Sequence, residues 1–338
     1  MIFRKSNMSE NAVISVLITA YNIEDYIGQT LQSVLLQESL YPFEILVGDD
    51  GSDDRTVDII NSYIKDNPGR IKLFQMPREK GVEYNRVERS SANRLNLLKN
   101  ATGRYCSFLD GDDIYTDKKR LEKMADKLEA MKNRDCIACA HNLDMLYEDG
   151  RRKPLCSARR ERKISLKDYW TQMFLQSDAF MFRNIYREHE PKGRLKSLFD
   201  DNNITFWFLR YGKIYYLPEA MAAYRQVGGS SWNAIDDLKR AASNMIGYSM
   251  ERELAPELKK YSDARHYKDL KYLAKHKKDL KRENLEPFYT TAEKLKLQYA
   301  LEAYSMNGHW IEKSLKSGRR GIRKAAMRRR IRKLFGRY

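Results

Sequence analysis

The stretch YCSFLDGDDIYTDKKRL, residues 105–121, places three carboxylates, Asp110, Asp112 and Asp113, directly after an apolar run. The run YCSFLD predicts a buried strand, and the segment from residue 117 onward predicts a helix. Neighbouring carboxylates repel one another unless a cation or a hydrogen-bond donor offsets their charge. The stretch therefore indicates a strand that ends in a binding site.

On both sides of this stretch, predicted strands alternate with predicted helices. Apolar runs predict strands at residues 12–20, 43–50, 71–76, 105–110 and 136–142, and apolar residues at helical spacing predict helices at 21–39, 56–67, 86–101 and 117–133. Strands separated by helices of this length imply right-handed crossovers and an α/β fold with a mostly parallel sheet. Ligands of such sheets bind beyond the carboxyl ends of the strands.

Three polar clusters fall at those carboxyl ends: TAYN at 19–22, GDDGSDD at 48–54 and DGDD at 110–113. A single acidic turn after a strand is most often a solvated helix cap, but three polar ends at one sheet edge favour a ligand site. Aspartate oxygens suit Mg²⁺ or Mn²⁺, and a divalent cation implies an anionic ligand such as a diphosphate. No glycine-rich phosphate loop follows the first strand, so metal and carboxylates are expected to hold the phosphates.

The length of 338 residues predicts one or two domains. The composition favours a protein of a reducing compartment. No uncharged apolar stretch of about 18 residues is present, so no membrane-spanning helix is expected. The first residues lack the apolar core of a signal peptide. Four scattered cysteines make no disulfide framework in a chain of this length. We therefore expect a cytoplasmic protein.

The positive charge is concentrated at the C-terminal end of the chain. Residues 234–338 hold 27 basic and 13 acidic residues, a net charge of +14, whereas the whole chain carries +17. This difference predicts two domains, a nearly neutral one at 12–233 and a helical basic extension at 234–338.

The last 26 residues, 313–338, contain 12 basic residues and no acidic ones. Apolar side chains recur among them every three to four residues: Ile322, Met327, Ile331, Leu334 and Phe335. This pattern is typical of a helix that lies on an anionic membrane surface. A solvated basic tail is the main alternative, and nucleic-acid binding is the third.

Four blocks of the sequence follow one another in a recognisable order: VISVLITAYNIEDYIGQTLQSVLLQ (13–37), FEILVGDDGSDDRTVDII (43–60), ATGRYCSFLDGDDIYTDKKRL (101–121) and FDDNNITFWFLRYGKIYYLPEAMAAYR (199–225). Together they resemble the family 2 glycosyltransferases of the GT-A fold. The resemblance implies a Rossmann-like, mostly parallel mixed sheet with flanking helices. The Gln-x-x-Arg-Trp motif of the processive, membrane-spanning polymerases is missing, so the resemblance implies addition of one sugar per binding event.

The resemblance also assigns roles at the expected donor site. Thr19 and Tyr21 match positions that line the base of the nucleotide. Asp50 matches the residue that holds the edge of a uracil, which implies a UDP-sugar. Arg94 matches a basic position near the donor. Trp232, in a glycine- and serine-rich stretch, matches a lid region and is expected to stack on a sugar face.

The acidic residues receive metal-binding and catalytic roles from the same resemblance. Asp110 and Asp112 are expected to contact the donor. Asp112 and Asp113 are the candidate ligands of Mn²⁺ or Mg²⁺, and the sequence leaves open which one lies closer. Asp201 matches the general base that deprotonates the acceptor hydroxyl, with Asp200 as the next candidate. The alternative interpretation of Asp201 is the N-cap of the helix that follows it.

From these residues we predict an inverting glycosyltransferase of the hexosyl- or N-acetylhexosaminyltransferase class. It would transfer one sugar to a lipid-linked glycan acceptor, for bacterial surface polysaccharide or glycoconjugate, at the inner face of the plasma membrane. A nucleotidyltransferase is one alternative, but it would need a glycine- and arginine-rich loop after the first strand. A non-catalytic nucleic-acid-binding or scaffold protein is the other. We expect no nucleic-acid partner.

Overall fold

The computed structural model describes residues 12–82, 84–131, 135–166, 168, 175–226, 236–258, 269, 272, 273, 275 and 276. Contacts within the chain divide these residues into two compact units. The first unit holds 12–166 and 175–226, and the second holds the other described residues. The domain boundary between residues 233 and 234 stays a prediction.

Within the described residues of the first unit, ten strands form one mixed sheet. The strands are β1 (Ile14–Ala20), β2 (Phe43–Asp49), β3 (Ile71–Gln75), β4 (Tyr105–Asp110), β5 (Ile114–Tyr115), β6 (Cys136–Leu146), β7 (Arg152–Pro154), β8 (Arg162–Ile164), β9 (Phe180–Arg183) and β10 (Lys213–Arg225). The helices are α1 (Ile27–Leu35), α2 (Thr56–Asp66), α3 (Arg86–Asn100), α4 (Arg120–Ala130), the 3₁₀ turn η1 (Ser177–Ala179), α6 (Arg194–Ser197) and α7 (Asp201–Tyr211).

The order of the main strands is β3-β2-β1-β4-β9-β6-β10-β5. Parallel pairing joins β3 to β2, β2 to β1, β1 to β4 and β6 to β10, which confirms the predicted mostly parallel mixed sheet. The sequence did not reveal β9, a four-residue strand that lies antiparallel between β4 and β6. A strand this short carries too little periodicity to be recognised.

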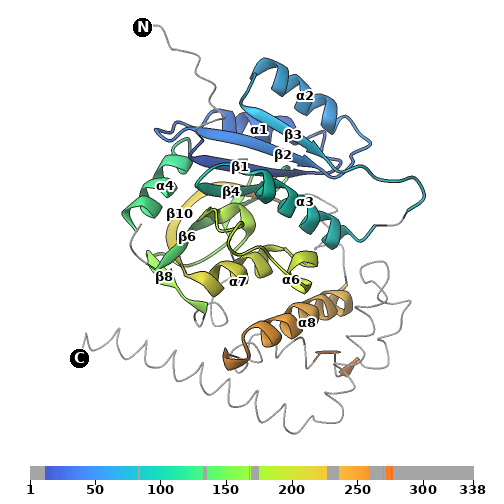
Figure 1. Ribbon diagram of the computed structural model, residues 1–338, viewed down its shortest axis with the longest axis vertical. Helices are drawn as coiled ribbons and strands as arrows, with labels where there is room; N and C mark the ends of the chain where they lie inside the picture. Colours follow the sequence, from blue (N-terminus) through green and yellow to red (C-terminus); the bar gives the residue numbers. More distant parts are fainter. Residues whose placement is uncertain are drawn as a thin grey trace. The chain divides into compact units, whose positions relative to one another are not determined.

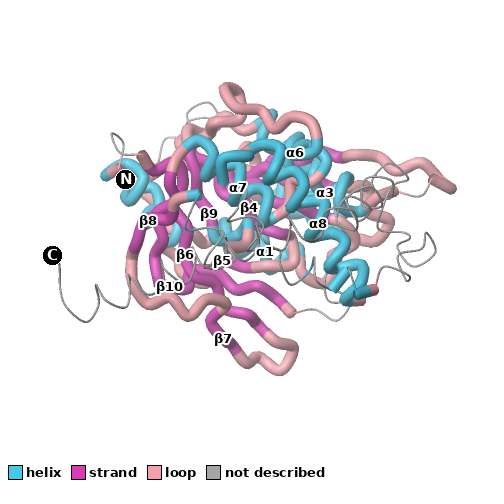
Figure 2. Tube along the Cα trace, turned by 90° about the horizontal axis from the view of Figure 1, so that it is seen from below, coloured by secondary structure: helices cyan, strands magenta, loops and turns pink. Residues whose placement is uncertain are grey.

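The two faces of the sheet are covered by different helices. On β1, the side chains of Ile14, Val16 and Ile18 pack in one core with Leu31 of α1 and Ile60 of α2. Successive residues of a strand point to opposite faces, so the intervening residues face the other layer. Figure 1 shows α2 and α3 on opposite sides of β1, β2 and β3, and Figure 2 shows α7 beside β4 and β9.

Gly48 of β2 allows α3 to approach the sheet closely. A Cβ atom at this position would lie 2.0 Å from Oδ1 of Asn93 and 3.1 Å from Cγ of Leu97. The amide of Asn93 instead donates a hydrogen bond to the carbonyl oxygen of Gly48 at 2.7 Å. This contact places the neighbouring Arg94 of α3 beside the carboxyl ends of the strands.

The second unit contains the helix α8 (Asp237–Leu254) and the 3₁₀ turn η2 (Pro256–Leu258), in the region predicted to be helical. The basic segment 313–338 lies outside the described residues. In the part of the chain that the structure describes, no helix is both long enough and apolar enough to cross a bilayer.

Candidate functional site

The three predicted polar clusters meet at one edge of the sheet. β1 lies between β2 and β4 with parallel pairing on both sides, so all three strands end together. The hydroxyl of Thr19, at the end of β1, donates a hydrogen bond to Oδ1 of Asp110, at the end of β4, at 2.9 Å. The backbone N–H of Asp50, just after β2, donates to the carbonyl oxygen of Ala20 at 2.9 Å.

The two neighbouring acids Asp49 and Asp50 have different tasks. The carboxylate of Asp49 accepts hydrogen bonds from the backbone N–H groups of Gly51 and Ser52 and so shapes the turn after β2. The carboxylate of Asp50 is bound by two guanidinium groups, those of Arg78 and Arg89, each at 2.5 Å. Two such charge-assisted bonds fix the carboxylate of Asp50 in position.

The same arginines lie against the rings of two tyrosines. The guanidinium carbon of Arg78 lies 4.0 Å from the ring centre of Tyr21 and 5.4 Å from that of Tyr84. That of Arg89 lies 4.8 Å from the ring centre of Tyr84. Tyr21 keeps 37% of its surface exposed. An exposed aromatic ring beside guanidinium groups suits a stacked nucleobase. Arg78 and Arg89 were not predicted as site residues, because neither belongs to a motif.

Arg94 of α3 pairs with the first acid of the DGDD cluster. One of its terminal nitrogens, Nη2, donates to both carboxylate oxygens of Asp110, at 2.9 and 3.2 Å. Burial by itself would lower the pKa of Arg94, but the charges of Asp110, Asp201 and Asp178 outweigh burial and raise it. Arg94 is therefore a permanent cation in the middle of an acidic site.

Asp112 and Asp113 have different surroundings in the turn between β4 and β5. Asp113 is fully buried, and its Oδ1 accepts a hydrogen bond from the backbone N–H of Arg225 at 2.7 Å. Asp112 is half-buried. Burial and the nearby charge of Asp110 raise the pKa of Asp112 to about 6. A divalent cation beside Asp112 would offset this repulsion.

Asp178 of η1 is a member of the site that sequence reasoning missed. It is 1% exposed, and its Oδ1 accepts a hydrogen bond from the backbone N–H of Asp110 at 2.9 Å. Its carboxyl group also contacts that of Asp113. Burial raises the pKa of Asp178 to about 7 and, with the contact, raises that of Asp113 well above its usual value. Two neighbouring buried carboxylates repel one another, which adds to the effect of burial on the pKa of Asp113.

Asp200 and Asp201, the adjacent acids at the start of α7, make different contacts. The N-cap of α7 is Asp200, whose Oδ1 accepts a hydrogen bond from the backbone N–H of Asn203 at 3.0 Å. The N-cap interpretation of Asp201 is therefore wrong. Instead, Oδ1 of Asp201 accepts a hydrogen bond from the backbone N–H of Ser177 at 2.9 Å. Burial raises the pKa of Asp201, which makes its carboxylate more basic.

The site offers carboxylate oxygens that could bind a divalent cation. Among the residues that the structure describes, no three His, Cys, Asp or Glu side chains are grouped to hold a metal ion. A half-buried Asp112 still fits Mg²⁺ or Mn²⁺, since such ions are usually bound by one or two carboxylates together with substrate phosphates.

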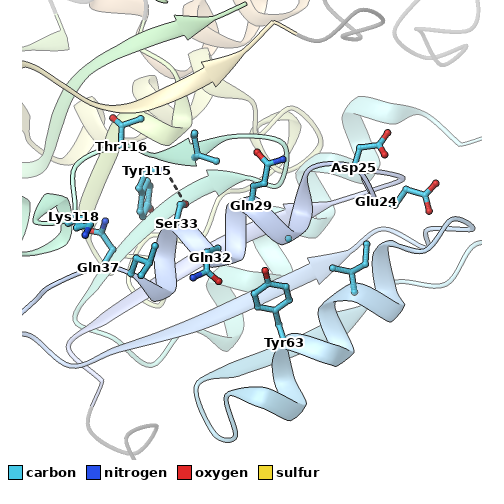
Figure 3. Close-up of a pocket in the computed structure, with 14 residues that line it drawn as sticks. Glu24, Asp25, Gln29, Gln32, Ser33, Gln37, Tyr63, Tyr115, Thr116 and Lys118 are labelled. Atoms are coloured by element: carbon cyan, nitrogen blue, oxygen red, sulfur yellow. Dashed lines mark hydrogen bonds between the residues drawn. The ribbon is translucent and has the colours of Figure 1, made fainter. Parts of the chain in front are cut away.

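Trp232 lies outside the described residues, and a cavity along α1 lies apart from the site residues named above. This cavity, of about 580 Å³, lies between α2 and β5 and is lined by residues that include Gln29, Gln32, Tyr63 and Thr116 (Figure 3). None of the residues predicted to bind the donor lines this cavity, so we do not assign it to the donor.

Comparison with known proteins gives a consistent result. The chain matches the sequence profile described as "Glycosyl transferase family 2" over residues 15–189. A relative from Campylobacter jejuni, GalNAc(5)-diNAcBac-PP-undecaprenol beta-1,3-glucosyltransferase, is 25% identical over 282 residues, which cover 79% of this chain and 84% of the relative. The chain spans only 66% of the length of uncharacterized Mycobacterium proteins with which it shares 27% identity over 253 residues, or 71% of its own length.

Two solved structures share the fold. S. aureus TarS in complex with UDP-GlcNAc superposes with a TM-score of 0.55 at 19% identity, covering 93% of this chain and 91% of TarS. Mannosyltransferase PcManGT from Pyrobaculum calidifontis, in complex with GDP-Man and Mn²⁺, gives a TM-score of 0.52 at 15% identity, covering 98% and 89%. These similarities confirm the GT-A fold.

Proposed function

Since this chain belongs to glycosyl transferase family 2, we propose that it transfers one sugar from a nucleoside diphosphate sugar to a glycan acceptor, with inversion at the transferred carbon. The observation that carries this proposal is the convergence of three groups at one sheet edge. The first is the ring of Tyr21 and the carboxylate of Asp50, which both contact Arg78. The second is the DGDD turn at 110–113, and the third is Asp201 near Asp110 and Arg94. Neither alternative considered from the sequence is favoured by the family match.

The nucleotide is proposed to be UDP. Asp50 is fixed by Arg78 and Arg89, and a fixed carboxylate is a suitable acceptor for the N3–H of uracil. The exposed ring of Tyr21 would stack against the base. TarS was solved with UDP-GlcNAc, which supports this choice, whereas PcManGT was solved with GDP-Man.

Asp112 is proposed to hold the divalent cation. When bound, Mn²⁺ or Mg²⁺ would neutralise charge on the leaving diphosphate as a Lewis acid. Asp112 is the better placed of the two candidates, because Asp113 is buried and both sides of its carboxyl group face protein groups. Asp110 is tied to Thr19 and Arg94, so it would orient a donor hydroxyl and leave the metal to its neighbour.

Asp201 is proposed to take the proton of the acceptor hydroxyl as that oxygen attacks the sugar. Its Oδ1 is held by the backbone N–H of Ser177, and Oδ2 is proposed to face the acceptor. A base on the side opposite the leaving diphosphate gives a single displacement, which inverts the anomeric centre. Asp200 caps α7 and thereby fixes the backbone from which Asp201 projects.

The acceptor is proposed to be a lipid-linked glycan of a bacterial surface polysaccharide or glycoconjugate. The Campylobacter jejuni relative is named for action on an undecaprenol-linked acceptor, and the basic segment 313–338 would bring the enzyme to anionic lipid. The protein would then work at the inner face of the plasma membrane.

The function is tested by mass spectrometry of the full chain incubated with Mn²⁺ and UDP-, GDP- and dTDP-sugars. We expect a UDP-sugar to be consumed.

In calorimetry with Mn²⁺, UDP should bind more tightly than GDP, and Asp50→Asn should remove this preference. Asp58→Asn, at an exposed position of α2, is the matched control and should keep it. An equal or reversed preference in the wild type would overturn the assignment of uracil to Asp50.

Membrane attachment is tested by flotation with liposomes of varied anionic content. A chain that ends at Glu312 should no longer float but should still transfer sugar to a short soluble acceptor. Each basic residue near an anionic surface contributes up to ~1 kcal/mol, and this field fades within a Debye length. Replacing Ile322, Ile331 and Phe335 by serine keeps the charge and removes the apolar face, so flotation should become sensitive to salt. Equal flotation of the truncated chain, or RNA binding in place of lipid binding, contradicts the proposal.

A further inference from the structure

The 3₁₀ turn η1 connects the DGDD strand to the proposed base. Oδ1 of Asp178 accepts the backbone N–H of Asp110, at the end of β4, at 2.9 Å. One residue earlier, the backbone N–H of Ser177 donates to Oδ1 of Asp201 at 2.9 Å. Ser177 and Asp178 are both buried. A single short turn therefore sets the distance between β4 and the carboxylate of Asp201.

The carboxyl group of Asp178 also lies next to the turn that carries the proposed metal ligand. The carboxyl groups of Asp178 and Asp113 are in contact, and Oδ1 of Asp113 accepts the backbone N–H of Arg225, the last residue of β10. Among the described residues, Oδ2 of each acid is buried and receives no hydrogen bond from a donor. The side chain of Asp178 thus joins η1, the DGDD turn and the end of β10.

Arg120 of α4 supports η1 from within the core. This guanidinium is fully buried, and its Nη2 donates to the carbonyl oxygens of Asp178, at 2.7 Å, and Phe180, at 3.3 Å. Its other nitrogens donate to Oγ of Ser107 at 2.9 Å and to Nε2 of His141 at 2.7 Å. These four acceptors are neutral groups. A buried cation is costly to keep, and here it fixes the backbone of η1 through a planar set of donors.

We propose that Asp178 is a positioning residue for sugar transfer, which holds η1 so that Ser177 keeps the carboxylate of Asp201 in place for the acceptor hydroxyl. This inference rests on the proposed role of Asp201 as the base. Asp178 acts through Asp201 and does not itself contact the substrate. A displacement of about 1 Å in a reacting group can lower a rate on the order of 100-fold, so the effect should appear in kcat.

Asp178→Ala and Asp178→Asn separate positioning from charge. Alanine removes both contacts of the side chain, and we expect kcat to fall roughly 10- to 100-fold while the donor KM changes less than about twofold. Asparagine can accept the N–H of Asp110 and donate its amide to Asp113, so it should restore kcat to within about threefold of the wild type. Should Asp178→Ala be insoluble, Asp178→Ser replaces it, because serine is too short to make both contacts.

The double variant Asp178→Ala with Asp201→Asn tests whether the two residues act together. We expect kcat of the double variant to equal that of Asp201→Asn alone. Once the base is absent, its displacement can have no further effect on the rate. An Asp178→Asn variant as slow as Asp178→Ala would make the carboxylate itself the active group and overturn the proposal. A fall in kcat that is matched by an equal loss of donor affinity and of thermal stability would also overturn it, because the role would be structural.

A crystal structure of Asp178→Ala provides a readout that does not depend on activity. We expect the carboxylate of Asp201 to be displaced from its wild-type position, and an unmoved Asp201 overturns the inference. Wild-type protein that consumes no nucleotide sugar would instead contradict the proposed function. The two failures are therefore distinguishable.

Discussion

Replacing Asp201 by asparagine will lower kcat by roughly 10²–10⁴-fold, the usual scale of lost general-base catalysis, and will leave donor binding unchanged. Asparagine has the shape of aspartate, and its amide oxygen can still accept the backbone N–H of Ser177. It cannot take a proton from the acceptor hydroxyl. Steady-state transfer rates and calorimetry with UDP and Mn²⁺ measure the two quantities separately.

The adjacent Asp200 offers a matched control. Asparagine caps a helix about as well as aspartate, so Asp200→Asn should keep the bond to Asn203 and most of the activity. Burial raises the pKa of Asp200 to about 6, so this group also has the basicity that a proton acceptor needs. A normal rate for Asp201→Asn together with a slow Asp200→Asn would move the role of base to Asp200.

Replacing Asp112 by asparagine will remove most of the metal-dependent activity. Loss of Lewis-acid stabilisation worth several kcal/mol corresponds to roughly 10²–10³-fold in kcat/KM. Excess EDTA should reduce the wild type to a similar level. Because the pKa of Asp112 is raised to about 6, protons should compete with Mn²⁺ below that pH, and the apparent Mn²⁺ affinity should fall as pH decreases. Manganese titrations of transfer rate at several pH values measure this.

Asp113→Asn decides between the two metal candidates. Its amide oxygen can accept the N–H of Arg225 and its amide nitrogen can donate to Asp178, so the buried contacts survive. We therefore expect the Mn²⁺ affinity of this variant to stay near that of the wild type. Weak Mn²⁺ binding by Asp113→Asn, with normal binding by Asp112→Asn, would reverse the assignment. Full turnover of the wild type in EDTA would exclude a metal role for both.

The sequence by itself determined the layout of the strands and where they end. Hydrophobic periodicity is a local property, so β1, β2, β3 and β4 were predicted to within a few residues of their observed bounds. Parallel pairing then requires their carboxyl ends to meet, and the bond from Thr19 to Asp110 confirms that two of the three polar clusters are in contact.

Only the tertiary structure decided which polar groups pair within the site. Asp178 lies 68 residues from Asp110, and nothing in the local sequence around it indicates that partner. The same holds for Arg78 and Arg89, which reach Asp50 from 28 and 39 residues away. The choice of Asp200 over Asp201 as N-cap likewise depended on η1, which supplies Asp201 with another donor. Burial and hydrogen-bond partners arise from packing between distant segments, and these set the charge and position of each acid.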